Sequence, residues 1–362
     1  MNLHKYIKNI NKSCILLAMT GLLLLSGCKT KSAGIALITN GIQTEDSDTM
    51  SSAEEGIEKF AKNNNKSYTS FTSTEQNTKG YEAAIDKALG AGAEIIICPG
   101  KEFETAVYNR QKDNLSVKFI ILNGVPHAAD SDKEKLRGNT HAALFAEEQS
   151  GYLAGYSAVW EGNTNLGFMG GEKNDQTMHY GSGFVQGADA AAKEMGLNAD
   201  QVVIRYGYLG TTLTSPQVEE TAAAWYDGGC QVIFGCDHSI LNAIAMAASS
   251  RGRRVITVDN ILSDFSANVL SCISYNYGSV IYKLLNSIEE NEYPGGEVQT
   301  VGVGSDGVYL DFDHSALNNF TSDKYDELCK ELKSGRRKIK TVDVTKNLSK
   351  YKIDNVTVNL DK

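Results

Sequence analysis

Short apolar runs rich in β-branched residues alternate along this chain with segments of helical periodicity, and this alternation constrains the fold more than any other feature. The strand-like runs of the first half are residues 35–39, 67–72, 95–98 and 117–123. A wholly apolar strand such as 95–98 is typical of a parallel sheet that helices cover on both faces. The first half therefore predicts a doubly wound α/β unit.

A second unit of the same kind follows. The polar segment 127–139 interrupts the rhythm, which restarts with a helical pattern at 145–160. The strand-like runs of the second half are residues 165–170, 202–206, 232–236 and 255–259. The elements after residue 269 exceed what one closing strand requires, so we expect the chain to cross between two lobes more than once. The predicted fold is two doubly wound parallel-sheet lobes joined by a multi-stranded hinge.

The boundaries of these lobes are expected to be discontinuous. We predict an N-terminal lobe from 33–125 plus about 270–295, and a C-terminal lobe from 126–269 plus about 296–335. Residues 336–362 form a basic C-terminal tail, for which a solvated helix end and linker is favoured over contact with anionic lipid.

The N-terminus carries the pattern of an exported lipoprotein. Three lysines and no acidic residue precede an apolar run that ends in Leu25-Ser26-Gly27-Cys28. The apolar stretch 14–25 is shorter than the roughly 20 residues of a spanning helix, so an uncleaved anchor helix is the less favoured alternative. We expect residues 1–27 to be a removed signal peptide, Cys28 to be lipidated, and residues 28–32 to be a short tether.

Length and charge narrow the classes of function. Removing 27 of 362 residues leaves 335, more than the roughly 250–300 at which a single core stops growing. Loss of the three signal lysines takes the formal charge from −9 to −12, which argues against a nucleic-acid partner. The five cysteines after Cys28 lack paired spacing, so neither a disulfide framework nor a zinc site is expected. The composition suits an exported, acidic, two-domain protein.

Polar residues gather where the predicted parallel strands end. In open parallel sheets, ligands bind outside the carboxyl ends of the strands. The candidates at these ends that we assign to a ligand site are Asn40, Asn123, Glu172, Asp237, Asp259 and Tyr275. Each has an ordinary alternative explanation, because loops need polar side chains to satisfy free backbone groups. Together they predict a polar cleft.

Several stretches, taken in order, resemble the basic membrane protein family of lipoproteins, which includes purine nucleoside receptors of ABC importers. These stretches are 145–155, 166–171, 183–187, 223–234, 258–260, 269–273 and 305–308. The likeness covers roughly residues 33–332. It implies two lobes of the type I periplasmic-binding-protein fold that close on a nucleoside, with the base stacked on aromatic rings and the ribose hydroxyls held by a carboxylate.

The resemblance carries over to only some positions. Asp259 matches the family's ribose-binding aspartate, Tyr180 falls where an aromatic ring stacks on the base, and Asp46 falls at the Asp of the family's Asp-x-Ser-Phe-Asn signature. The sequence then departs, with Thr49 and Met50 where Phe and Asn are expected. Tyr275 replaces a ligand-contacting lysine and is a candidate for the missing ring. A purine nucleoside is favoured, and another nucleoside or a small polar aromatic ligand remains open.

The resemblance implies a binding protein without cofactor or catalytic chemistry. We expect an extracytoplasmic, lipid-anchored receptor that presents its ligand to an ABC permease and ATPase. A ligand-sensing or adhesin-type lipoprotein of the same fold is the alternative, and a nucleoside hydrolase built on Glu45, Asp46 and Asp48 is a remote one. The G-x-G-x-x-G at 302–307 precedes a strand-like run, so it predicts a turn and no dinucleotide site.

Overall fold

The computed structural model describes residues 34–41, 49–131, 133–210, 213–259, 262–347 and 352–361. The strands are β1 (Ile35–Thr39), β2 (Tyr68–Thr72), β3 (Ile95–Pro99), β4 (Lys118–Leu122), β5 (Thr140–Phe145), β6 (Asn165–Gly170), β7 (Val203–Tyr208), β8 (Val232–Gly235), β9 (Arg254–Val258), β10 (Val269–Tyr275), β11 (Val298–Val301), β12 (Val308–Asp311) and β13 (Thr357–Leu360). The α-helices are α2 (Thr49–Asn64), α3 (Thr78–Gly90), α4 (Glu104–Gln111), α5 (Glu147–Trp160), α6 (Asp175–Glu194), α7 (Ser215–Asp227), α8 (His238–Ser249), α9 (Tyr277–Glu289), α10 (Ser322–Lys333) and α11 (Val344–Asn347), and the 3-10 helices are η1 (Lys101–Phe103), η2 (Ser263–Asn268) and η3 (Val303–Ser305). Among the described helices, none combines the length and the apolar character needed to cross a bilayer.

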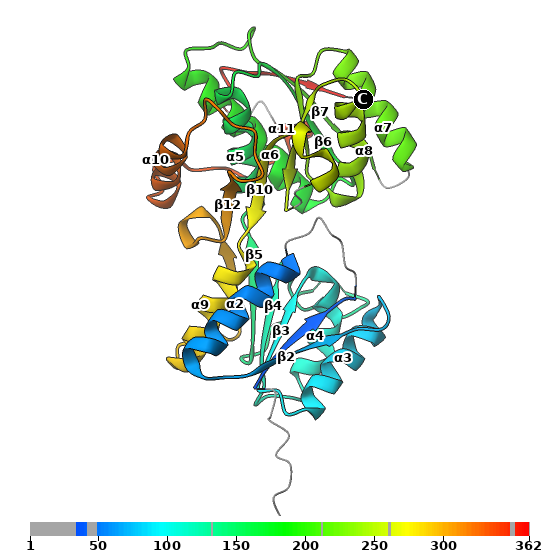
Figure 1. Ribbon diagram of the computed structural model, residues 1–362, viewed down its shortest axis with the longest axis vertical. Helices are drawn as coiled ribbons and strands as arrows, with labels where there is room; N and C mark the ends of the chain where they lie inside the picture. The colour runs from blue at the N-terminus through cyan, green and yellow to red at the C-terminus, as the bar shows by residue number, and fades with distance from the viewer. Residues whose placement is uncertain are drawn as a thin grey trace, which may run out of the picture.

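The N-terminal lobe is a six-stranded sheet in the order β11-β5-β4-β3-β1-β2, with parallel pairing throughout its described strands (Figure 1). Alternate residues of β1 face opposite sides, as strand geometry requires. Ile35 and Leu37 belong to the apolar cluster of α2 and α9, whereas Ala36 and Ile38 belong to that of α3 and α4. Both faces are therefore covered, which explains why the strand has no polar side.

The C-terminal lobe is a seven-stranded sheet in the order β12-β10-β9-β8-β6-β7-β13, in which only β12 pairs antiparallel among the described strands. Phe168 and Phe234 pack on the side of α5 and α6. Met169 and Ile233, their neighbours in sequence, pack on the side of α7 and α8. This second lobe is therefore also doubly wound.

The hinge between the lobes contains several crossings of the chain. In the described residues, β5 of the first sheet leads into α5 of the C-terminal lobe, and β10 of the second sheet leads back into α9. β11 then returns to the second sheet through η3 and β12 (Figure 1). The predicted multi-stranded hinge is confirmed. The glycine-rich 302–307 is the turn at the last crossing and, as expected, precedes a strand.

The division of strands between the lobes differs from the expected boundaries. β5 belongs to the first sheet, although the boundary was expected at residue 126, and β11 also lies in that sheet. β10 lies in the second sheet, while α9, which follows it, packs in the apolar cluster of α2. β5 was not predicted because its residues Thr140 and His141 are polar although fully buried. Its sequence therefore lacks the apolar pattern of a buried strand.

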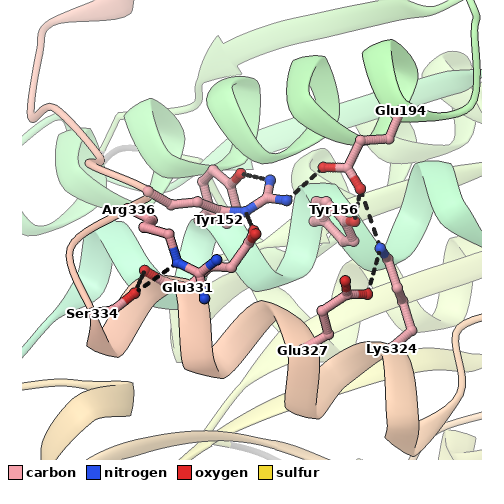
Figure 2. Close-up of polar contacts among 9 residues, drawn as sticks. Tyr152, Tyr156, Glu194, Lys324, Glu327, Glu331, Ser334 and Arg336 are labelled. Carbon is pink, nitrogen blue, oxygen red and sulfur yellow. Dashed lines mark hydrogen bonds and ion pairs between the residues drawn. The ribbon is translucent and has the colours of Figure 1, made fainter.

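The basic C-terminal segment lies against the C-terminal lobe; we call residues 336–346 and 352–361 the C-terminal strap. The Arg337 guanidinium donates to the Tyr152 hydroxyl at 2.9 Å and to Glu194 Oε1 at 2.6 Å, and it also donates to Glu331. Figure 2 shows the side chains of Tyr152, Glu194 and Glu331 gathered at this place, with Lys324 also paired to Glu194. Further along the strap, β13 pairs in parallel with β7 and extends the second sheet. This arrangement differs from the expected solvated linker, because a half-buried arginine with three partners and a strand register hold the strap.

Candidate functional site

Residues that follow the carboxyl ends of strands from both sheets line a cavity of about 400 Å³ between the lobes. A parallel sheet brings all its strand ends to one edge, and the hinge turns the two edges toward each other. The walls of the cavity therefore come from these two facing edges. The volume is of the order that accommodates a small ligand.

The N-terminal lobe supplies a wall of amides and charged groups. Asn40 follows β1, Lys101 and Glu102 follow β3, and Asn123 follows β4. Asn40 Nδ2 donates to Glu102 Oε1 at 2.6 Å, which ties two strand ends together. Asn123 has a φ of 58°, in the left-handed region that asparagine tolerates better than most residues. Such backbone conformations occur often at ligand sites.

The C-terminal lobe supplies the first turns of two helices. Asn174 caps α6, with Thr177 N donating to Asn174 Oδ1 at 3.0 Å and Asn174 N donating to Thr177 Oγ1 at 3.1 Å. Asp237 caps α8 and accepts from the backbone N of Ser239 at 3.0 Å. These caps use side-chain oxygens to satisfy free N–H groups of the helices. The capping residues therefore stand at the cavity in fixed orientations.

Asp259 connects the two walls. It follows β9, has a φ of 50°, and its backbone N donates to Ile273 O at 2.7 Å. The Thr49 hydroxyl, on the first residue of α2, donates to Asp259 Oδ2 at 2.8 Å. The Tyr277 hydroxyl lies close to the same carboxylate. A carboxylate of the C-terminal lobe is thus held by a hydroxyl from α2, with a hydroxyl from α9 nearby.

Aromatic side chains form the hinge side of the cavity. The Tyr275 ring stacks on Phe145, with centroids 4.3 Å apart and planes within 7°, and its hydroxyl is hydrogen-bonded to that of Tyr180. Tyr180, Tyr275 and Tyr277 are only 2%, 4% and 4% exposed. Burial raises the pKa of all three phenols well above the usual value, so their hydroxyls stay protonated. They present neutral polar groups and little open ring surface.

The charges on the cavity lining favour some ligands over others. The described lining carries the carboxylates of Glu102, Asp237 and Asp259 and the ammonium group of Lys101. This balance is negative, so an anionic ligand meets repulsion, whereas a neutral ligand rich in hydroxyl or amino donors finds acceptors.

The structure brings most of the predicted site residues together. Those that line the cavity are Asn40, Asn123, Tyr180, Asp237, Asp259 and Tyr275. Glu172 is not among the lining residues, and its backbone oxygen accepts from Thr177 Oγ1 at 2.7 Å. Asp46, with Glu45 and Asp48 of the hydrolase alternative, lies outside the described residues, as does Cys28.

Other lining residues were not predicted. Glu102 lies shortly after the end of β3 and so carries the strand-end signal, although it is not among the predicted site residues. Asn174 has a recognisable capping pattern with Thr177, and that pattern predicts a helix start without predicting a cavity. Tyr277 has no local signal, because its position depends on how the hinge returns to the N-terminal lobe.

One group near the hinge has ligand atoms at metal-site spacing. Among the described residues, Glu147, Glu148 and His179 place one such atom each within 4.8 Å of one another. His179 Nδ1 lies 3.6 Å from Glu147 Oε2, and this contact raises the pKa of His179. Both glutamates occupy the first turn of α5, where carboxylates are favoured by the helix dipole. An ion pair at a helix start accounts for the group.

Comparison with known proteins agrees with this architecture. Residues 34–347 match the model of the Bmp family, described as ABC transporter substrate-binding protein PnrA-like. The ABC transporter nucleoside-binding protein BmpA of Lactococcus lactis subsp. cremoris is 25% identical over 346 residues, which covers 87% of this chain and 93% of BmpA.

Two solved structures share the fold. The solute-binding protein of an ABC transporter system from Conexibacter woesei has a TM-score of 0.67 at 19% identity and covers 85% of this chain and 98% of its own. An ABC transporter solute-binding protein from Aeropyrum pernix has a TM-score of 0.63 at 16% identity, with coverages of 87% and 97%. The predicted type I periplasmic-binding-protein fold is confirmed.

Proposed function

The chain belongs to the Bmp family of PnrA-like ABC transporter substrate-binding proteins, and from this premise we propose that it binds a nucleoside between its two lobes and delivers it to an ABC permease. The observation that carries the proposal is the polar cavity at the facing strand ends, with Asp259 among the residues that line it. A related chain named as nucleoside-binding, BmpA, supports the choice of ligand class.

The chemistry of the lining fits a nucleoside. Ribose hydroxyls donate well to carboxylates such as Asp259 and Glu102, and the amides of Asn40 and Asn123 both donate and accept. The tyrosine hydroxyls add neutral partners at the hinge side. The negative balance of the lining favours a nucleoside over its phosphorylated form, since a phosphate would face carboxylates. Purine nucleosides are our favoured members of the class.

A thermal-shift series tests this ligand class. Adding purine nucleosides should raise Tm by several degrees, because a ligand at 100 times its Kd stabilises the native state by about 2.7 kcal/mol. Free purine bases, free ribose and the matching nucleoside monophosphates are the controls, and each should shift Tm less. Shifts from ribose alone, with none from any nucleoside, would contradict the proposal.

We further propose that Cys28 carries the lipid anchor that keeps the protein at the outer face of the cell membrane. The support is the lysine-rich, apolar N-terminal segment that ends in Leu25-Ser26-Gly27-Cys28. Cys28→Ala should block lipid attachment and signal cleavage, so the product should migrate as a larger, unacylated chain on a gel. Cys230→Ala, which changes a buried thiol, is the control and should be processed normally. Equal mobility of the two variants would exclude lipidation.

A further inference from the structure

We propose that Thr49 is a positioning residue that works from across the cleft: its hydroxyl orients the ligand-binding carboxylate of Asp259 and, by the same bond, latches the two lobes together. The inference rests on the proposed function only for the identity of the ligand. The latch itself is a property of the protein without ligand. No corresponding role follows from the resemblance, in which a phenylalanine is expected where Thr49 stands.

The two partners of this bond belong to different lobes. Thr49 begins α2, which lies on the first sheet and packs against α9, whereas Asp259 follows β9 in the second sheet. Thr49 Oγ1 donates to Asp259 Oδ2 at 2.8 Å. Opening the cleft must break this bond, because α2 moves with the N-terminal lobe and β9 with the C-terminal lobe.

A second hydroxyl lies near the carboxylate on the same side. Tyr277 is the first residue of α9, which packs on α2, and its hydroxyl lies close to Asp259. Asp259 is 7% exposed and its backbone is in the left-handed region. A buried charge needs such donors, and hydrogen bonds to a charged group are stronger than neutral ones. The Thr49 hydroxyl, with the Tyr277 hydroxyl beside it, therefore fixes the direction of the carboxylate.

Binding and closure are consequently coupled through one side chain. The latch favours the closed arrangement before ligand arrives, so the group that receives the ligand is already oriented. A ligand shifts the population of states only by its differential affinity for them, and here Asp259 contributes to that difference. Without the Thr49 hydroxyl, the lobes should open further in the absence of ligand, and the carboxylate should bind its ligand less well.

Thr49→Val and Thr49→Ser form a matched pair for the test, since valine keeps the shape of threonine and serine keeps the hydroxyl. Small-angle scattering of the full chain without ligand should give a larger radius of gyration for Thr49→Val than for wild type, with Thr49→Ser unchanged. Calorimetry with inosine should give a Kd roughly tenfold weaker for Thr49→Val, and within about threefold of wild type for Thr49→Ser. Tyr277→Phe, which keeps the ring, should change both measurements in the same direction as Thr49→Val.

Two results would overturn the inference. Equal radii of gyration for Thr49→Val, Thr49→Ser and wild type would show that the latch does not exist. Equal inosine affinities for the two variants would show that Thr49 does not position Asp259. If inosine and other nucleosides bind neither the variants nor the wild type, the proposed ligand class is wrong. The scattering comparison, made without ligand, still decides whether the latch exists.

Discussion

Gly187→Ala is expected to lower the free energy of unfolding by about 3 kcal/mol, at the upper end of the range for overpacking, although alanine is the better helix former. A Cβ on Gly187 would lie 2.1 Å from the backbone oxygen of Tyr152. A backbone atom inside a helix cannot turn aside as a side chain can. Helices α5 and α6 would have to separate, and urea unfolding monitored by circular dichroism should record the loss.

Gly90→Ala is the matched control. Gly90 is the last residue of α3, and a Cβ there would meet nothing within 4 Å. The same substitution should therefore leave stability unchanged or raise it by up to about 1 kcal/mol through helix propensity. If both variants unfold at the same urea concentration, the close approach of α5 and α6 does not limit stability.

Close packing of α5 against α6 explains why two of the stretches that resemble the family contain glycines. Gly155 and Gly187 lie in the resembling stretches 145–155 and 183–187, and each approaches backbone of the other helix, with a Cβ at Gly155 lying 2.1 Å from Phe184 O. These stretches thus specify helix packing. Because α6 also places Tyr180 in the cavity, we expect ligand binding to weaken in Gly187→Ala along with stability.

The fold was predictable where local pattern and burial agree. Residues 95–98 are apolar without interruption because β3 lies between β1 and β4 with helices on both faces. The same reasoning identified strands β6 to β9 of the C-terminal lobe and the repeated crossing of the hinge. Parallel sheets in which both faces are buried leave a strong mark on the sequence, and a single chain suffices to detect it.

Elements held by specific polar partners were not predictable in this way. β5 contains the fully buried Thr140 and His141, and His141 Nδ1 is 3.0 Å from Pro294 O, a partner far along the chain. The C-terminal strap looks like a solvated basic segment until Arg337 meets Glu194 and Tyr152. Those contacts depend on tertiary structure, which composition and periodicity do not encode.

Residues of the site were predictable where the sheet topology alone determines their position. The strand-end rule selects Asn40, Asn123 and Asp259 because parallel strands share one edge. It does not say which side chains at that edge face the cavity, and Glu172 does not line it. The pairing of Thr49 with Asp259 depends on how the hinge sets one lobe against the other. No local stretch of the sequence indicates how the two lobes are oriented relative to each other.

Asp259→Ala is expected to weaken nucleoside binding by about 1.5–3 kcal/mol, or roughly 10- to 150-fold in Kd, the value of a hydrogen bond to a charged group. The substitution removes the acceptor proposed for the ribose hydroxyls and releases the Thr49 hydroxyl. Isothermal calorimetry with inosine, on wild type and variant at the same ionic strength, measures the difference.

Backbone strain must be separated from the loss of the carboxylate. At a φ of 50° the Cβ of any such residue crowds the following carbonyl oxygen at a cost of about 1–2 kcal/mol, and alanine lacks the side-chain oxygens that offset part of this cost for aspartate, so Asp259→Ala should lose some folding stability. Asp259→Gly removes the carboxylate without this strain and should weaken binding as much as Asp259→Ala. Asp306→Ala is the reverse control, since Asp306 has a φ of 59° and does not line the cavity, and it should lose stability without losing affinity.

The comparison of these variants identifies the role of the carboxylate. If binding falls in Asp259→Ala and not in Asp259→Gly, the loss arises from a strained backbone and not from a missing acceptor. If affinity is unaltered in both, Asp259 is not part of the ligand site, and Glu102 on the opposite wall becomes the carboxylate to test. Weakening in both variants, with Asp306→Ala binding normally, assigns the loss to the missing carboxylate, and comparison with Thr49→Val then separates its contact with the ligand from its bond to Thr49.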